Sequence, residues 1–283
     1  CDPWFEGKAF NNGWSLIDES YDNEQIIKFL KHKNKKLFIW YSHEHSDHFS
    51  TNFIKCATTN NLKFEVIYKD SLDQRVSNYF KKQNIKVHLV SKEKPIYNVS
   101  KNIIISAHAF SYSKKHTDDS FALIKFNNLA ILNLNDCEVN TEEDLNFIKS
   151  RVKKDTNQID IIFSQFGYAG FCEPNNKISD RKATADNVIS RINRLINFFN
   201  PSIFIPFASF MYFSNSKNFF MNDVQNNPTI LVKKLENTEY FKKISLLLPM
   251  KDFNTDDDLY IKIMNDKENA IKYWSDKYNH KIN

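Results

Sequence analysis

The sequence is poor in glycine and cysteine and lacks long hydrophobic runs. Only four glycines and four cysteines occur in 283 residues. The cysteines are far apart and form no CxxC or CxH unit, which argues against a disulfide framework and against a local zinc knuckle. No apolar run approaches the ~18 residues of a membrane-spanning helix, and the first residues do not have the pattern of a signal peptide. We therefore expect a cytoplasmic protein with free thiols and no membrane partner.

The composition is that of a folded globular chain. It is 41% hydrophobic and 26% charged, with a formal net charge of +5. The excess positive charge favours an anionic small-molecule substrate. The basic runs at 31–36 and 151–154 fall at predicted helix ends, so we interpret them as solvated helix surface and expect no nucleic-acid partner.

Hydrophobic periodicity predicts alternating strands and helices. Helical spacing covers 22–32, 71–82, 141–154, 184–199 and 228–243, another helix begins near 50–53, and an amphipathic helix ends the chain. Strand-like runs lie at 36–42, 64–69, 85–90, 102–107, 121–126, 129–134, 159–164, 202–207 and 244–249. Because many of these runs are apolar on both faces, the pattern indicates buried sheets covered by helices, an α/β class. We expect one domain over 1–283, with 250–283 as a C-terminal helical extension.

The segment WYSHEHSDHF at 40–49 is the strongest chemical signal in the sequence. His43 and His45 stand two apart, so an extended backbone places both imidazoles on one side, and Asp47 and His48 follow where the chain turns into a helix. Imidazole and carboxylate ligands without a nearby thiolate favour zinc, iron or manganese in a catalytic site. The alternative is a polar loop in which the histidines only cap a helix.

An HxHxDH motif after an apolar strand resembles the signature of the metallo-β-lactamase superfamily. The segments CDPW at 1–4 and ILNLNDCE at 131–138 are similar to further family motifs, in the same order. The resemblance implies a four-layer αββα sandwich with metal ligands on loops at one edge of two sheets. Members carry two or three strands before the DPW segment, so we expect either that the first strands lie outside this chain or that the first sheet is completed in another way.

The resemblance also implies a set of ligands for two divalent metal ions, zinc first, with iron or manganese as alternatives. The implied ligands are His43, His45 and His116 for one ion, Asp47, His48 and Asn215 for the other, and Asp136 as the bridge. His108 is the rival of His116. Where the family places a last histidine this chain has Asn215, whose amide oxygen is a weaker ligand, so the second site is expected to be weakened, changed in metal or lost.

A narrower resemblance covers most of the chain. CDPWFEGKAFNNGWSL, YSHEHSDHFS, HTDDSFALIKFNNLAILNLNDCE, FSQFGYAGF and NPSIFIPFASFMYF resemble the metallo-β-lactamase-like part of CMP-N-acetylneuraminate hydroxylases and related bacterial surface-glycan proteins. This implies nucleotide sugars or sialic-acid-like glycans as the substrate class. The CxH and CxxH pairs of a Rieske iron–sulfur domain are absent from the sequence, so electron delivery for a hydroxylation would have to come from elsewhere.

The site chemistry predicts hydrolysis by a metal-activated water, and the resemblance implies a phosphorylated, nucleotide-sugar or glycan-related small molecule as the substrate. Asp47 is the residue expected to orient that water or accept its proton. Two alternatives stay open: a non-heme diiron oxygen-activating enzyme, which would need a redox partner, and a non-catalytic scaffold that retains the fold. A homodimer is carried as a further hypothesis.

The expected substrate-binding residues are Trp4, Asn12, Tyr168 and Lys177. Trp4 and Asn12 belong to an aromatic and amide cluster after the first motif, and Tyr168 belongs to FGYAGF. Such groups can stack on a base or a sugar and bind hydroxyls, although core packing explains any single aromatic as well. Lys177 lies in 173–184, which we predict to be a mobile loop able to hold a phosphate, with a solvated surface loop as the alternative.

Overall fold

The computed structural model describes residues 1–71, 74–91, 94–110, 119–168, 177–255 and 258–282. The strands are β1 Lys8–Ala9, β2 Trp14–Leu16, β3 Leu37–Tyr41, β4 Phe64–Lys69, β5 Val87–Val90, β6 Ile96–Ser100, β7 Ile103–Ala109, β8 Ser120–Phe126, β9 Leu129–Asn135, β10 Ile161–Gln165, β11 Ile203–Phe207 and β12 Met211–Phe213. The helices are α1 Asn23–His32, α2 Thr51–Thr59, α3 Arg75–Lys82, α4 Glu142–Val152, α5 Ile178–Phe199, α6 Pro228–Leu235, α7 Leu259–Asn265 and α8 Lys267–Ile282, with 3₁₀ turns η1 Phe219–Asp223 and η2 Glu239–Lys243.

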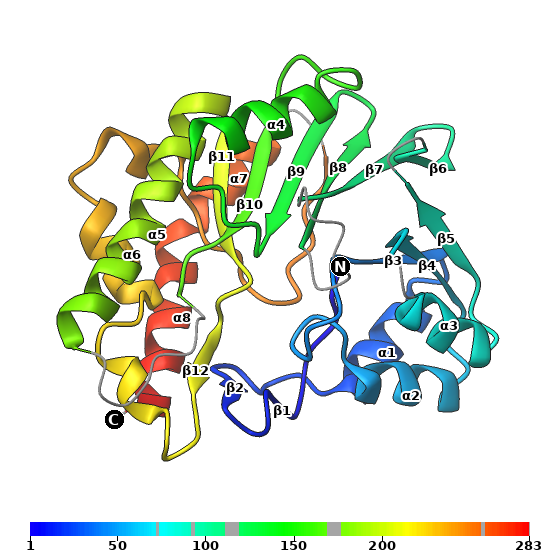
Figure 1. Ribbon diagram of the computed structural model, residues 1–283, viewed down its shortest axis with the longest axis horizontal. Coiled ribbons are helices and arrows are strands. Elements are labelled where there is room, and N and C mark those ends of the chain that lie inside the picture. Colours follow the sequence, from blue (N-terminus) through cyan, green and yellow to red (C-terminus); the bar gives the residue numbers. More distant parts are fainter. Residues whose placement is uncertain (72–73, 92–93, 111–118, 169–176, 256–257, 283) are drawn as a thin grey trace.

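Two layers form the N-terminal half of the fold. Strands β3, β4 and β5 make a parallel sheet in that order, and α1, α2 and α3 cover one of its faces (Figure 1). Ile27, Phe53 and Phe80 from the three helices belong to one buried cluster with Tyr41 and Val66 of the sheet. Alternate residues of a strand point to opposite faces. The side chains of β3 and β4 that point away from the helices can therefore pack against another layer.

The second contact joins this small sheet to a six-stranded mixed sheet. That sheet has the order β11-β10-β9-β8-β7-β6; β9, β10 and β11 are parallel, and β6 to β9 pair antiparallel. Trp40 and Ile67 of the small sheet pack with Ile105, Ala107 and Ala122 of the large one. The two sheets therefore pack face to face.

Helices α4, α5 and α6 cover the opposite face of the large sheet (Figure 1). Leu132 and Phe204 of the sheet pack there against Ile148, Ile192 and Leu231 of the three helices. The layer order is helix, sheet, sheet, helix. The predicted αββα architecture is confirmed.

The small sheet leaves β10 and β11 uncovered on the inner face, and helix α7 lies there. Ile161 and Ile205 pack with Leu259 and Ile263 of α7. Beside them, β1, β2 and β12 form a third small sheet, in which β2 is the central strand. Helix α7 thus covers the part of the large sheet formed by β10 and β11, and the three-stranded sheet is separate from the other two sheets.

Two secondary-structure predictions are wrong, and the helix predicted at 228–243 is divided into α6 and the 3₁₀ turn η2. The run 244–249 forms only an isolated bridge between Phe204 and Ile244; the carbonyl of Leu247 instead accepts a hydrogen bond from Trp274 Nε1 at 2.8 Å. The predicted loop at 173–184 is helical from Ile178 onward. Arg181 is buried at helical spacing before Ala185 and pairs with Asp223, so a charged residue in a buried helical position hid the periodicity.

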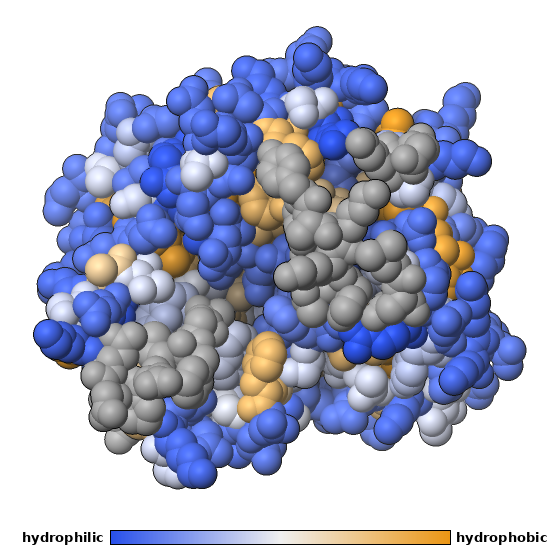
Figure 2. Space-filling view, in the orientation of Figure 1, coloured by the Kyte–Doolittle hydropathy of each residue, from blue (hydrophilic) through white to orange (hydrophobic). Residues whose placement is uncertain are grey.

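The face seen in Figure 2 is covered mainly by hydrophilic side chains, and hydrophobic ones appear in small separate areas among the described residues. One large side chain left half-exposed is Phe10, at 40%. In the described part of the chain, no helix is long and apolar enough to cross a membrane.

Candidate metal centre

The HxHxDH segment lies between the end of β3 and the start of α2. The backbone N–H groups of His48 and Phe49 both donate to the carbonyl of His45, at 3.0 and 2.7 Å, which closes a tight turn. The hydroxyl of Ser50 then caps α2 by accepting from the N–H of Phe53 at 3.2 Å. The turn and the cap together aim the motif's side chains at the edge of the sheets.

The end of β9 brings the partner carboxylate. Asn135, the last residue of β9, has a positive φ of 49° and turns the chain so that Asp136 faces the motif. His48 Nε2 lies 3.0 Å from Asp136 Oδ2 and 3.1 Å from Asp47 Oδ2. His43, His48 and Asp136 each offer one ligand atom within 4.8 Å of the others.

A second group of donors adjoins the first. His43 Nε2 lies 2.8 Å from His45 Nδ1 and 3.4 Å from Asp119 Oδ1. Asp119, which precedes β8, was not among the predicted site residues. The signal was present in the sequence: β8 and β9 are antiparallel neighbours, so the start of β8 lies beside the end of β9, and an aspartate directly before β8 lies near Asp136.

Asp2 orients two of these histidines from behind. Its carboxylate accepts from Ser42 N at 2.8 Å and Ser42 Oγ at 2.7 Å, from the Asn135 amide, and faces His48 Nδ1 at 3.3 Å. Because the Ser42 hydroxyl donates to Asp2, the 2.9 Å contact between Ser42 Oγ and His43 Nδ1 requires Nδ1–H to donate to the hydroxyl. The lone pair of His43 Nε2 is therefore left for the cluster. The contact of Asp2 with His48 Nδ1 is the arrangement that outer-shell carboxylates give metal-ligating histidines.

Burial and the aspartates set the protonation of the cluster. Burial lowers the pKa of His43. Burial also opposes charge on His48, but the charges of Asp136 and Asp47 raise its pKa well above the ordinary value. The pKa of Asp119 is raised to about 7, mainly by burial and secondly by the negative charge of Asp136. Asp47, Asp119 and Asp136 place several negative charges close together, so a positive charge bound among them is favourable.

These residues fit a divalent cation. Asp47 Oδ1 and Asp136 Oδ1 are buried, yet neither has a hydrogen-bond partner among the described residues. A buried carboxylate oxygen without a donor is costly unless a cation is bound to it. The donors are imidazole nitrogens and carboxylate oxygens, the set that zinc, iron and manganese accept.

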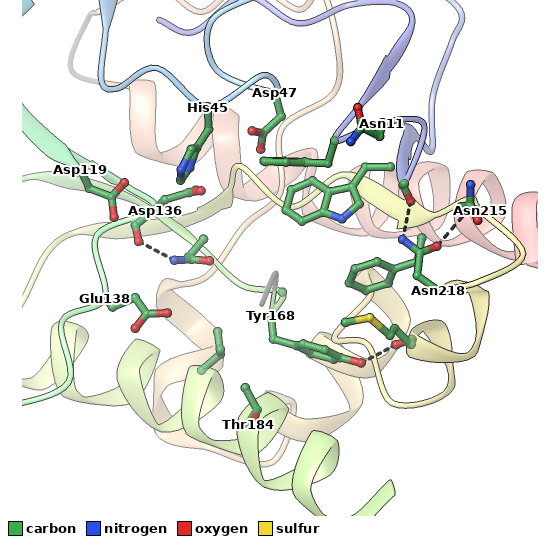
Figure 3. Close-up of a pocket in the computed structure, with 18 of the residues that line it drawn as sticks. Asn11, His45, Asp47, Asp119, Asp136, Glu138, Tyr168, Thr184, Asn215 and Asn218 are labelled. Atoms are coloured by element: carbon green, nitrogen blue, oxygen red, sulfur yellow. Dashed lines mark hydrogen bonds between the residues drawn. The ribbon is translucent and has the colours of Figure 1, made fainter. Parts of the chain in front are cut away.

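The cluster forms one side of a cleft of about 860 Å³. Figure 3 shows His45, Asp47, Asp119 and Asp136 on this side, with Asn11, Asn215 and Asn218 on the opposite side. The cleft therefore has an acidic side and an amide side.

The turn between β1 and β2 closes the cleft near the histidines. Phe10 N donates to Ser46 Oγ at 3.1 Å, and the Phe10 ring centroid lies 4.4 Å from that of Trp14 and 5.8 Å from that of His45. Phe10 has a φ of 50°, which is strained for a residue with a large side chain. Strain of this kind persists where surrounding contacts impose it, commonly at binding sites.

The other predicted metal ligands are not all brought to the cluster. Asn215 lies across the cleft from Asp136 (Figure 3), and its Oδ1 accepts from the N–H of Lys217 at 3.0 Å. His108 lies on the opposite face of the large sheet, because it pairs with Phe121 of β8 and its ring stacks on that residue, with centroids 5.2 Å apart. Burial lowers the pKa of His108 to about 4. His116 lies outside the described residues.

The predicted substrate-binding residues lie in different places. Tyr168 lines the cleft but is buried, and its hydroxyl donates to the carbonyl of Met221 at 2.5 Å. Trp4 lines a second cavity of about 330 Å³ behind Asp47 and His48. Asn12 is exposed with a φ of 65°, while its neighbour Asn11 lines the cleft. Lys177 is the exposed residue immediately before α5.

Comparison with known proteins supports the fold. No protein-family model and no curated protein sequence matches this chain. Among solved structures, it is similar to CmlA, a diiron beta-hydroxylase from Streptomyces venezuelae, with a TM-score of 0.51 and 10% identity over 74% of this chain and 43% of that chain. A mutant of CmlA gives a TM-score of 0.52 and 10% identity over 75% and 43% of the two chains.

The metallo-β-lactamase-fold protein YhfI from Bacillus subtilis gives a TM-score of 0.42 and 7% identity, covering 65% of this chain and 69% of that chain. The present chain spans less than half the length of CmlA. At 10% identity the likeness to CmlA concerns the fold alone. The likeness therefore supports the αββα fold, and the resemblance to the metallo-β-lactamase superfamily holds at the level of the fold.

Proposed function

We propose that this protein is a metal-dependent hydrolase acting on an anionic small molecule. The observation that carries the proposal is the cluster of His43, His48 and Asp136 at the edge of a cleft, with two buried carboxylate oxygens that have no hydrogen-bond donor among the described residues. Divalent ions bound there would polarise a carbonyl or phosphoryl oxygen and lower the pKa of a water molecule.

Residues of the cluster have different roles in the proposed hydrolysis. Asp47 holds His48 with one carboxylate oxygen and keeps the other unpartnered among the described residues, and it also lines the cleft. We assign Asp47 to orient the attacking water and accept its proton, since a carboxylate within hydrogen-bond reach of the nucleophile serves as general base. His45 and Asp119 line the same side of the cleft and complete the donor set.

The substrate class follows from the size and lining of the cleft. A volume of about 860 Å³ accommodates a molecule of nucleotide-sugar size. Phe10 and Trp14 offer aromatic faces for a base or a sugar ring, and Asn11 and Asn218 offer amides for hydroxyl groups. A phosphorylated, nucleotide-sugar or glycan-related substrate is therefore our proposal. The narrower resemblance to CMP-N-acetylneuraminate hydroxylases stays a prediction.

The second candidate is a non-heme diiron oxygenase. CmlA, which has the same fold, is a diiron beta-hydroxylase, and the histidine and carboxylate donors of this cluster suit iron as well as zinc. This function would require a separate reductant or redox partner. The ligands would be the same, so the identity of the bound metal separates the two candidates.

The first test is elemental analysis of protein purified without added metal, followed by electron paramagnetic resonance and Mössbauer spectroscopy if iron is found. We expect about two zinc or manganese ions per chain, together with turnover of phosphoester or nucleotide-sugar substrates. Two coupled irons with substrate-dependent oxygen consumption would favour the oxygenase. Protein that binds no divalent metal, even after incubation with zinc, manganese or ferrous iron, would contradict both candidates.

A further inference from the structure

Helix α5 brings a buried cation to the cleft. Arg191 is 2% exposed and lines the cavity that contains the candidate metal centre. Thr184, Asn187 and Val188 line the same cavity, and with Arg191 they follow the i, i+3, i+4, i+7 spacing of one helix face. Figure 3 shows Thr184 on the α5 side of the cleft, with Glu138 near Asp136. One face of α5 therefore forms a wall of the cleft.

The guanidinium of Arg191 is only partly satisfied. Its Nε and Nη2 donate to Asn140 Oδ1, at 3.3 and 3.1 Å. Nη1 is buried and has no hydrogen-bond partner among the described residues. The acceptor of both hydrogen bonds is the neutral side-chain amide of Asn140, so these bonds do not balance the positive charge of the guanidinium. A buried charge that lacks an anionic partner is strongly destabilising.

The surroundings keep this arginine charged. Burial lowers the pKa of Arg191, and the negative charges of Glu138 and Asp136 oppose that change. Arginine stays protonated in proteins because its pKa in water is above ~12. The α5 wall thus contains a positive charge beside the candidate metal centre, and Nη1 of this arginine has no hydrogen-bond partner among the described residues.

We propose that Arg191 binds a carboxylate group of the substrate while the metal centre acts on another part of the same molecule. The inference rests on the proposed function and narrows its substrate class. A carboxylate is favoured over a phosphate dianion because Glu138 also lines the cleft, so an added single negative charge is repelled less than a double one. The planar guanidinium matches a carboxylate in geometry as well as in charge.

The test uses a matched pair of probes, phenylacetate and phenylacetamide, whose binding is measured by ligand-observed NMR titration. Both metal-loaded and metal-free protein are examined. We expect the acid to bind about tenfold more tightly than the amide in both forms. Arg191→Gln should remove this preference from the metal-free protein. Lys182→Gln, which removes the same charge from an exposed position on α5, should leave the preference unchanged.

Equal binding of acid and amide by metal-free wild-type protein would overturn the inference without any variant, so the test stands even if Arg191→Gln fails to fold. Tighter binding of phenylphosphonate than of phenylacetate would overturn the choice of carboxylate. An acid preference that appears only in metal-loaded protein and survives Arg191→Gln would place the carboxylate on the metal ions. That result would remove the role of Arg191 and leave the proposed hydrolase intact.

Discussion

Individual side chains in this protein depend on partners that are remote in the sequence. Asp2 is the clearest case, because one carboxylate contacts Ser42, His48 and Asn135. These contacts join the first residues of the chain to the ends of β3 and β9. The orientation of the histidines therefore depends on a residue outside their own motif.

Asp2→Asn should weaken metal binding without unfolding the protein. The amide keeps the size of the side chain but loses the charge that holds Ser42 and His48, so we expect metal affinity to fall about 10- to 100-fold. Competition with a chromophoric chelator measures this affinity. Asp18→Asn is the matched control, because Asp18 pairs with Lys277 and Tyr273 instead; equal loss in both variants would count against an orienting role for Asp2.

A histidine of the large sheet, outside the candidate cluster, provides a comparison with His43 and His48. His43→Ala combined with His48→Ala should reduce the metal content to background, since both belong to the ligand cluster. His108→Ala should retain the metal content of the wild type, because His108 stacks on Phe121 outside this cluster. Elemental analysis of the three proteins measures the effect, and metal loss in His108→Ala would show that the cluster is assigned wrongly.

At the scale of elements, the loops that follow β10 and β11 are tied to each other near the cleft. Ser209 Oγ accepts hydrogen bonds from the backbone N–H groups of Phe166 and Gly167, at 3.1 and 2.9 Å. Gln165, just before them, donates to the carbonyl of Asp136 at 2.7 Å. One hydroxyl therefore supports the segment that contacts the candidate metal ligand.

Ser209→Ala should destabilise the protein by about 1–3 kcal/mol, because it leaves two buried N–H groups without an acceptor. Thermal or urea unfolding measures the change. Ser190→Ala is the control: Ser190 is exposed on α5 and its hydroxyl donates to the carbonyl of Asp186, so we expect a change near zero. Similar midpoints for the wild type and Ser209→Ala would refute the tethering role.

At the scale of the whole molecule, the C-terminal helix α8 is part of the main fold. The Trp274 ring stacks on Phe210 with centroids 4.0 Å apart, and its Nε1 donates to the carbonyl of Leu247. Tyr273 and Lys277 of the same helix contact Asp18 near the N-terminal end of the chain. The last residues thereby support the segment between β11 and β12 that borders the site.

Trp274→Ala should lower the free energy of unfolding by about 3–5 kcal/mol, because a large buried side chain and its hydrogen bond are both lost. Urea unfolding measures the loss. Lys272→Ala changes an exposed residue of the same helix and should shift the stability by less than about 0.5 kcal/mol. A small effect of Trp274→Ala would mean that α8 is separable from the rest of the fold.

Metal binding should also stabilise the molecule as a whole, because the candidate ligands follow β3 in one sheet and β9 in the other. An ion that binds the folded state alone, at a free concentration 100 times its Kd, adds about 2.7 kcal/mol. We expect a chelator to lower the melting temperature of the wild type and to have little effect on the His43→Ala and His48→Ala double variant. A melting temperature that is independent of chelator in both would contradict the site.

The sequence by itself determined the α/β class and the motif at 43–48. Both are local signals: apolar spacing over a few residues identifies the strands and helices, and histidines two apart on an extended segment lie on one side. Most predicted elements are confirmed for the same reason. The exceptions include 244–249 and the start of α5, where pairing and a buried arginine overrode the local pattern, and 228–243, which forms α6 and a separate 3₁₀ turn. The αββα layer order, in contrast, was implied by the resemblance to the metallo-β-lactamase superfamily, and the observed sheets agree with it.

The tertiary structure alone decided which remote residues reach the site. Side chains alternate between the faces of a strand, so a residue's face depends on strand pairing rather than on its distance along the sequence. Pairing with Phe121 sends His108 away from the cluster, whereas the antiparallel contact of β8 with β9 accounts for the presence of Asp119. Arg191 reached the cleft only because α5 packs along it. The metal motif is thus a local property of the sequence, and the cleft around it is a product of long-range packing.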